Sequence, residues 1–275
     1  MRLVPLALVV AALAGCGGSS DPFSFDATQP LGVRVAQRGL VAGVRVTDLS
    51  FAGPDDRVPA YLVEPTAPGR HPAVVFLHGA GGSRDDFVGE AIALAQRGLV
   101  GLALTSSYER STDLRVRENT EPVSVDRMLE VRSVVDVRRA LQLLRDRSDV
   151  DPKRIGLLGY SRGCQWAALA ASVEHPQAVV LMGPRAEPSH NVLPAKDRHL
   201  VTDLDTVRYM GRIAPAKLLL QGGRYDDVIP PADVTALYRA AKQPKQLHWY
   251  PTGHEFNGRT LNDQLAFLVR VLGSG

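Results

Sequence analysis

The pentapeptide Gly-Tyr-Ser-Arg-Gly at residues 159–163 constrains the fold of this chain more than any other feature of its sequence. It matches the pattern G-x-S-x-G. The apolar run before it, at residues 154–159, predicts a buried strand, and the Ala-rich run after it, at residues 164–171, predicts a helix. A strand, a sharp turn and a helix are the context of a nucleophile elbow, in which the serine is strained and the flanking glycines avoid collisions. Ser161 is therefore the predicted nucleophile, and the alternative is a plain strand-to-helix turn.

The length and composition of the chain are those of one globular α/β domain. Its 275 residues, 45% of them hydrophobic, suffice for a single large core. The formal net charge is +3, but lysine and arginine are interspersed with aspartate and glutamate. No basic run stands out, so nucleic acid is not a predicted partner. Outside the extreme N-terminus, no apolar run reaches the length of about 18 residues that a membrane-spanning helix needs.

The N-terminus has the pattern of a secretory signal peptide. A short positively charged start precedes an apolar stretch at residues 3–13 and small residues before Cys16. The run Leu-Ala-Gly-Cys that ends at Cys16 also resembles the lipobox of bacterial lipoproteins, in which the cysteine receives a diacylglyceryl group and becomes the new N-terminus. We therefore expect residues 1–15 to be removed and the exported protein to be anchored to a bacterial cell membrane through lipid on Cys16. The alternative is an ordinary signal peptide with an incidental cysteine.

The chain has only two cysteines, Cys16 and Cys164. If Cys16 carries lipid, no intramolecular disulfide can form. Cys164 lies three residues after Ser161, at the start of the predicted helix. It could be a second nucleophile, but we favour a small buried residue that packs this helix.

Apolar runs alternate between strand and helix patterns along most of the chain. A hairpin is predicted from the runs at residues 44–51 and 58–63, with a turn at 53–56. Buried strands are predicted at residues 73–77, 99–104, 154–159, 178–182, 216–220 and 246–250. Helices are predicted at residues 83–97, 125–147, 164–171, 231–242 and 261–272. Strands that alternate with helices after a hairpin favour an α/β fold with a doubly wound, mostly parallel sheet and an N-terminal antiparallel hairpin.

The domain organisation that follows has one folded unit. Residues 16–32 are expected to form a flexible tether, because a polar Gly-Gly-Ser-Ser run follows the cysteine, and residues 33–275 to form the domain. Residues 184–213 fit the strand and helix pattern poorly, since they contain three prolines between two predicted strands. This segment is either an insertion that caps the active-site face or an ordinary long loop with a helix.

Two later loops supply the partners that a nucleophilic serine needs. A serine hydroxyl requires a base to take its proton and a third group to orient that base. The loop at residues 221–230 follows a predicted strand and offers the acids Asp226 and Asp227, and His254 follows the last predicted strand. Loops at the carboxyl ends of parallel strands lie on the ligand-binding side of such a sheet. The order serine, acid, histidine is that of hydrolases built on this elbow.

At this point the chain resembles the α/β-hydrolase superfamily, in particular its dienelactone-hydrolase-like and prolyl-oligopeptidase-like esterase branch. The resemblance covers about residues 44–272 and rests on four motifs. They are the His-Gly-Ala-Gly-Gly run at residues 78–82, the elbow, the Gly-Arg-Tyr-Asp-Asp-Val-Ile-Pro run at residues 223–230, and Gly-His at 253–254. The family pattern of the third motif implies that Asp226 is the acid, with Asp227 as the competitor.

The resemblance also implies an oxyanion hole formed by the backbone N–H groups of Ala80 and Arg162. His78 is expected to orient its own loop. The chain departs from the family in three respects. Dienelactone hydrolase itself has Cys where this chain has Ser161, Cys164 replaces a common second glycine, and the N-terminal segment is too short for the propeller of prolyl-oligopeptidase-type enzymes.

These residues predict a serine hydrolase that cleaves carboxylic esters through an acyl-enzyme intermediate. Alternatives are a small peptidase or acyltransferase, or a lipid-anchored binding protein that kept the fold and lost catalysis. No cofactor is predicted, and no Cys, His or Asp cluster has the spacing of a zinc or calcium site. His190 and His199 lie in the segment at 184–213, but neither is predicted to take part.

Overall fold

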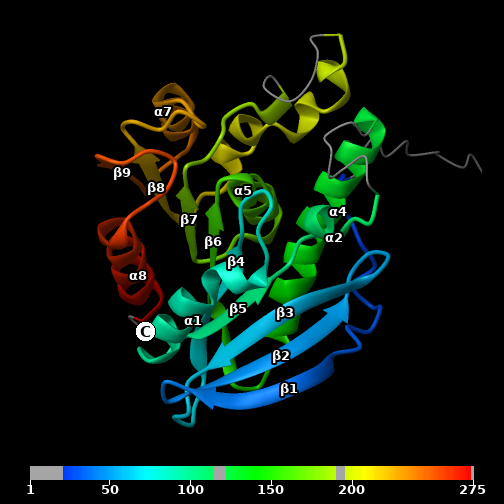
Figure 1. The fold of residues 1–275 in the computed structure, drawn as a ribbon, viewed down its shortest axis with the longest axis vertical. Coiled ribbons are helices and arrows are strands. Elements are labelled where there is room, and N and C mark those ends of the chain that lie inside the picture. The colour runs from blue at the N-terminus through cyan, green and yellow to red at the C-terminus, as the bar shows by residue number, and fades with distance from the viewer. Residues whose placement is uncertain (1–20, 114–121, 190–195, 274–275) are drawn as a thin grey trace, which may run out of the picture.

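A computed structural model describes residues 21–113, 122–189 and 196–273 of the chain. The expected signal peptide at residues 1–15 and the expected lipidation site Cys16 lie outside these ranges. The described residues form a nine-stranded sheet with the strand order β1-β2-β3-β5-β4-β6-β7-β8-β9, covered by helices (Figure 1). None of the helices in these ranges is both long enough and apolar enough to cross a membrane.

Six neighbouring strands of the sheet, in the order β5-β4-β6-β7-β8-β9, run parallel to one another, as expected from their apolar runs. They are β4 (His71–Leu77), β5 (Val100–Leu104), β6 (Val150–Tyr160), β7 (Ala178–Met182), β8 (Lys217–Gly223) and β9 (Lys245–Tyr250). Strands β5, β4, β6 and β7 are fully or nearly fully buried over their apolar stretches, because helices cover both faces of the sheet. The doubly wound, mostly parallel sheet is therefore confirmed.

The other edge of the sheet is antiparallel. The predicted hairpin is confirmed as β2 (Val44–Ala52) and β3 (Arg57–Glu64), and β3 pairs antiparallel with β5. A further strand, β1 (Arg34–Val41), pairs with β2 at the edge of the sheet. We did not predict β1. All of its residues are exposed, so no apolar alternation marks it in the sequence.

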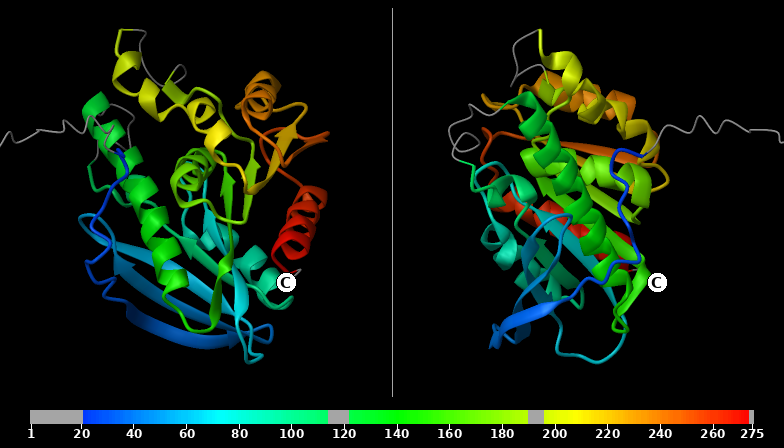
Figure 2. Two further views of the ribbon diagram at one scale, coloured as in Figure 1. Left: turned by 180° about the vertical axis from the view of Figure 1, so that it is seen from behind. Right: turned by 90° about the vertical axis from the view of Figure 1, so that its right-hand side faces the viewer.

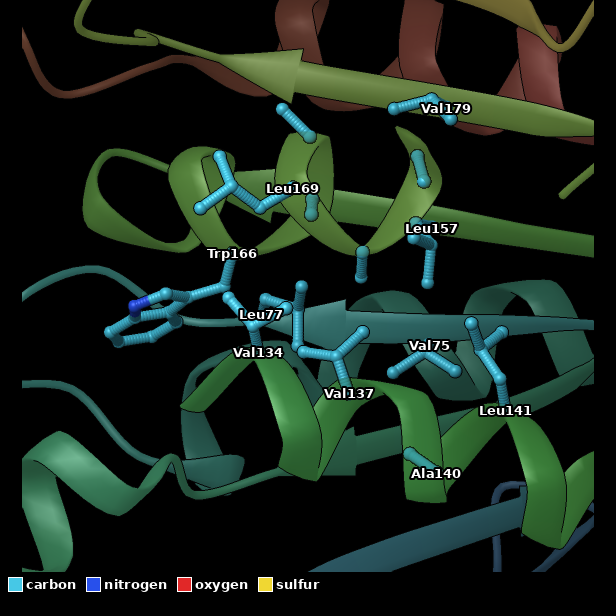
Figure 3. Close-up of a cluster of buried hydrophobic side chains, with 14 of the residues drawn as sticks. Val75, Leu77, Val134, Val137, Ala140, Leu141, Leu157, Trp166, Leu169 and Val179 are labelled. Atoms are coloured by element: carbon cyan, nitrogen blue, oxygen red, sulfur yellow. The ribbon is translucent and has the colours of Figure 1, made fainter. Parts of the chain in front are cut away.

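Helices cover the two faces of the sheet in two groups (Figures 1 and 2). One face carries α4 (Val123–Arg145), α5 (Arg162–Glu174) and α7 (Pro231–Ala240), and the other carries α1 (Val88–Ala95) and α8 (Gly258–Gly273). Alternate residues of β4 serve the two cores: Val75 and Leu77 belong to the first, Val74 and Phe76 to the second. Figure 3 shows Val134, Val137 and Leu141 of α4 beside Val75 and Leu77 in the first core.

The residues that precede β1 are packed against the domain. Phe23 is fully buried in the first core and its ring lies 5.9 Å from that of Tyr209. Asp21 forms an ion pair with Arg138 of α4 at 2.7 Å, and this segment runs along α4 (Figure 2). The expectation of a flexible tether over residues 16–32 is therefore wrong for residues 21–32. A buried phenylalanine and an ion pair hold them in place.

In the segment at residues 184–213, the described residues lie at the end of the sheet toward which β6 and β7 point (Figure 1). Its described part carries four short 3-10 helices, η2 (Arg198–Leu200), η3 (Thr202–Leu204), η4 (Thr206–Arg208) and η5 (Met210–Arg212). Met210 and Ile213 are buried in the first core. These anchors hold the segment over the carboxyl ends of the parallel strands, which is the side where the predicted functional residues gather.

Candidate active site

Ser161 lies at a sharp turn between β6 and α5. Its backbone has φ 52° and ψ −118°, a conformation that is strained for any residue other than glycine. The Ser161 N–H donates to the carbonyl of Met182 on β7 at 2.9 Å. The turn thus holds the serine side chain above the end of the sheet, as the elbow pattern predicts.

The two glycines of the elbow are required by close backbone contacts. A Cβ atom on Gly159 would lie 2.4 Å from the carbonyl oxygen of Gly163, and one on Gly163 would lie 2.3 Å from the carbonyl oxygen of Leu77. Both distances are well inside van der Waals contact. The close approach of α5 to β4 and β6 therefore depends on the absence of side chains at these two positions.

His254 lies in the loop between β9 and α8, and its imidazole reaches the serine. Its Nε2 is 2.9 Å from Ser161 Oγ. The ring of Tyr160 stacks on the imidazole at a centroid distance of 5.2 Å and an interplanar angle of 29°. Gly183 follows β7 with φ +61°, and a Cβ there would lie 3.3 Å from His254 Cε1. The histidine ring is thus fixed by an aromatic neighbour and by a close backbone approach.

Asp226 contacts the other nitrogen of the histidine. Its Oδ2 is 2.9 Å from His254 Nδ1, and its Oδ1 accepts the backbone N–H groups of Val228 at 2.9 Å and Ile229 at 2.7 Å. Asp226 is only 7% exposed, whereas its neighbour Asp227 is exposed. Of the two acids of this loop, Asp226 is the one whose carboxylate contacts His254.

The three side chains can move a proton in a defined direction. The carboxylate of Asp226 only accepts hydrogen bonds, so the proton on the imidazole stands on Nδ1 and Nε2 is free to accept from the hydroxyl of Ser161. Nε2 can then take the serine proton as the oxygen attacks, and Asp226 stabilises the imidazolium that forms. The contacts therefore permit transfer of the Ser161 proton to His254.

The loop at residues 78–82 lies beside the serine. His78 is buried, its Nε2 accepts the N–H of Ser106 at 3.1 Å, and its Nδ1 therefore donates to the carbonyl of Gly79 at 2.7 Å. Burial lowers the pKa of His78, which favours this neutral form. A Cβ on Gly79 would lie 3.3 Å from Ser161 Cβ, so the loop backbone passes directly alongside the nucleophile.

The two predicted oxyanion donors are the backbone N–H groups of Arg162 and Ala80. Arg162 is the first residue of α5, so its N–H has no acceptor within the helix, and the positive end of the helix dipole lies at this position. Ala80 follows the end of β4 in the glycine-rich loop. Both residues line the same cavity as Ser161.

A cavity of about 270 Å³ opens beside Ser161. The segment at residues 184–213 supplies much of its wall, including the apolar side chains of Val201 and Leu204. From the same segment, the lining also includes Arg185, Pro188, Ser189 and Asp205. The other lining residues are Ala80, Asp126, Glu130, Arg162, Gln165, Val228 and Ile229. Of the two histidines in the segment at 184–213, His190 lies outside the described residues, and His199 does not line the cavity.

Two acids of α4 reach the cavity and were not predicted from the sequence. Asp126 and Glu130 are both buried and lie one helical turn apart. Burial raises the pKa of Glu130 to about 7, although the guanidinium of Arg162 acts in the opposite direction. A signal was present, because acids at i and i+4 interrupt the apolar stripe of an otherwise buried helix face.

Cys164 faces the protein interior. It is fully buried, and its Sγ lies 3.1 Å from the carbonyl oxygen of Gly159 and 3.2 Å from that of Met182, so that the single S–H can donate to either. Burial raises the pKa of its thiol well above the ordinary value, so the reactive thiolate is disfavoured. These contacts suit the packing role that we favoured. Across residues 21–113, 122–189 and 196–273, no group of three or more His, Cys, Asp or Glu side chains could hold a metal ion.

Comparison with known proteins identifies related sequences. The model of the dienelactone hydrolase family matches residues 58–265. The protein YfhR of Escherichia coli is 32% identical over 130 residues, which are 44% of this chain and 45% of YfhR. Esterase EstD of Thermotoga maritima is 27% identical over 151 residues, covering 52% of this chain and 34% of EstD. The matches thus span less than half of these relatives.

Structural similarity extends over nearly the whole chain. The crystal structure of acetyl xylan esterase 1 from Thermoanaerobacterium superposes with a TM-score of 0.74 and 19% identity. The superposition covers 91% of each chain. With the strand order described above, this similarity shows the α/β-hydrolase fold.

Proposed function

We propose that the chain, which belongs to the dienelactone hydrolase family, is a serine hydrolase. It would cleave carboxylic esters through an acyl-enzyme. The observation that carries this proposal is the continuous hydrogen-bonded series from Asp226 through His254 to Ser161, with both distances at 2.9 Å. A binding protein on the same fold would have no need to keep this series aligned at the mouth of a cavity.

In the first half of the reaction, Ser161 Oγ attacks the carbonyl carbon of the ester and its proton passes to His254 Nε2. The carbonyl oxygen becomes an oxyanion that the N–H groups of Ala80 and Arg162 stabilise. When the tetrahedral intermediate collapses, the bond to the alcohol oxygen breaks and this oxygen takes the proton from His254. The alcohol leaves, and the acyl group remains on Ser161.

In the second half, water replaces the alcohol. His254 Nε2 takes a proton from the water as its oxygen attacks the acyl carbon, and the same two N–H groups hold the second oxyanion. Collapse releases the carboxylic acid and returns the proton to Ser161. The cavity of about 270 Å³ beside Ser161 suits a small acyl or alcohol group, which agrees with the size of group that acetyl esters carry.

We also propose that the protein is exported and held at a bacterial membrane by lipid on Cys16. The support is the leader pattern of residues 1–15 and the Leu-Ala-Gly-Cys run. A diacylglyceryl group gives stable attachment to a bilayer, whereas one acyl chain gives only marginal binding.

The test of the hydrolase proposal is the substitution Ser161→Ala in the full chain. We expect p-nitrophenyl acetate hydrolysis to fall about a thousandfold or more, by comparison with the loss of other nucleophilic serines, and covalent labelling by a fluorophosphonate to disappear. Ser172→Ala is the control, because Ser172 lies on the same helix and only donates to the carbonyl of Leu169. A Ser161→Ala protein that keeps a tenth of the wild-type kcat would contradict the proposal.

A further inference from the structure

The side chain of Arg162 does not extend into solvent. Its Nε is 3.2 Å from Glu130 Oε1, and its Nη2 is 3.8 Å from Asp126 Oδ1. Its Cζ lies 3.6 Å from the ring centroid of Tyr108, which belongs to α2 (Ser107–Arg110). The side chain is only 18% exposed. Residues of α4 and α2 therefore hold the side chain of Arg162, whose backbone N–H lies at the start of α5.

Glu130 makes a second contact with α5. The indole Nε1 of Trp166 donates to Glu130 Oε2, and Trp166 is fully buried. Arg162 and Trp166 lie one turn apart on α5. A single carboxylate of α4 thus holds the first two turns of α5, with one oxygen on each residue.

The start of a helix needs such support more than its middle does. The first N–H groups of α5 have no intrahelical acceptor, so hydrogen bonds within the helix do not fix their direction. An oxyanion hole requires a donor that already points at the position of the developing charge, within about 2.7–3.1 Å of it. A lateral clamp on Arg162 supplies this constraint without contacting the substrate oxygen.

We infer that Glu130 is a positioning residue for the oxyanion hole, because it fixes the backbone N–H of Arg162 through the Arg162 and Trp166 side chains. This inference rests on the proposed hydrolase function. The oxyanion exists only in the tetrahedral states, so loss of the clamp lowers kcat and leaves KM nearly unchanged.

The charge on Glu130 gives the clamp a pH dependence. Burial raises the pKa of Glu130 to about 7. The groups around it are Arg162 and Trp166 from α5, Asp126 on its own helix and Glu109 from α2, and Tyr108 of α2 lies against the Arg162 guanidinium. The ionised form attracts the guanidinium, and the protonated form does not. The clamp is therefore strongest above about pH 7 and weakens as the pH falls through that value.

The test compares Glu130→Gln with Glu174→Gln in the full chain. Glu174 is the last residue of α5 and pairs with Arg138 and Arg145 of α4, so the control removes the same kind of contact between the same two helices at the far end. We expect Glu130→Gln to lower kcat for p-nitrophenyl acetate about 10- to 100-fold, with KM within about twofold. Binding of methylboronic acid, which forms a tetrahedral adduct on serine, should weaken by a similar factor. Glu174→Gln should change only the Tm.

The pH profile separates positioning from folding. The ratio of the wild-type kcat to the Glu130→Gln kcat should be largest above pH 7 and shrink toward one below it, because protonated Glu130 and glutamine carry the same charge. The ratio for Glu174→Gln should stay flat. Should Glu130→Gln not fold, Trp166→Phe removes the indole donor, keeps an aromatic ring at the cost of a small cavity, and should lower kcat several-fold without changing KM.

Two outcomes have different meanings. A wild-type protein that neither hydrolyses the ester nor reacts with a fluorophosphonate contradicts the proposed hydrolase function. An active wild type with an unchanged kcat in Glu130→Gln, or with equal losses of kcat in Glu130→Gln and Glu174→Gln, overturns the inference about Glu130.

Discussion

Replacing Asp226 with asparagine changes one atom at the point where the acid meets the base. The amide oxygen can still take the place of Oδ1 and accept the N–H groups of Val228 and Ile229. In the wild type these two groups donate to Asp226 Oδ1 at 2.9 and 2.7 Å. The NH2 group then stands where Oδ2 is, 2.9 Å from His254 Nδ1. The amide NH2 and an Nδ1–H group are both donors and cannot bond to each other, so the imidazole must carry its proton on Nε2 and not on Nδ1. In that tautomer Nε2 cannot accept from Ser161.

The size of the effect follows from the tautomer. Loss of the correct tautomer costs about 10⁴ in kcat in a serine protease in which the same acid was changed to asparagine. A factor of 10⁴ corresponds to about 5.4 kcal/mol of transition-state stabilisation. Because the fold of the 226 loop keeps both backbone hydrogen bonds, we expect little change in Tm. The loss is therefore catalytic and not structural.

The assay is steady-state hydrolysis of p-nitrophenyl acetate by Asp226→Asn and Asp227→Asn, with thermal unfolding of both. Asp227 is exposed in the same loop, so its variant reports on the loop without touching the histidine. We expect Asp227→Asn to keep kcat within about threefold of wild type, because its side chain does not contact His254. The Tm should change little, because an exposed polar substitution usually has little effect on stability. Equal losses in the two variants, or a larger loss in Asp227→Asn, would refute the assignment of the acid.

Four further substitutions, one of them with a matched control, test the packing of the elbow, the N-terminal segment and the anchor. Cys164→Ala should keep ester hydrolysis within several-fold of wild type and lower stability by about 1 kcal/mol, because only a small cavity forms; loss of turnover in a folded variant would show that the thiol reacts. Phe23→Ala should cost about 3 kcal/mol or more in the free energy of unfolding, and an unchanged urea midpoint would mean that the segment does not pack. Gly163→Ala should destabilise the domain by about 1–3 kcal/mol or more and abolish activity, whereas Gly89→Ala, with nothing within 4 Å of its Cβ position, should raise the Tm slightly. Cys16→Ser should leave the protein out of the detergent-extracted membrane fraction of a bacterial host, and partitioning like wild type would contradict the lipid anchor.

The parallel sheet and the loops at its carboxyl ends were predictable because each carries a local pattern. The apolar run at residues 178–182 is the whole of β7. Ser161, Asp226 and His254 each follow a strand, and neighbouring parallel strands place their carboxyl ends at one edge. Chain order and local composition were enough to bring Ser161, His254 and the 226–227 acids to one edge, whereas the choice of Asp226 over Asp227 rested on the family resemblance.

The sequence carries a weaker signal for features that depend on contacts between distant segments than for the strands and loops of the parallel sheet. The edge strand β1 owes its existence to pairing with β2, and its own residues are all exposed. Phe23 lies in a polar stretch that has the composition of a tether, and its burial follows from a core built by residues far along the chain. The role of Glu130 depends on how α4 packs against α5, which neither helix reveals alone.

The packing of residues 21–32 sets how far the domain could travel from a membrane. Asp21 is fixed to α4, and five peptide units join it to Cys16. A fully extended chain gains at most about 3.6 Å per residue, so under the proposed anchor this link reaches about 18 Å. A free tether up to residue 32 would reach about 58 Å by the same arithmetic. The proposed enzyme would therefore work in a thin layer next to the lipid head groups, with a restricted set of orientations, and would meet its substrates there.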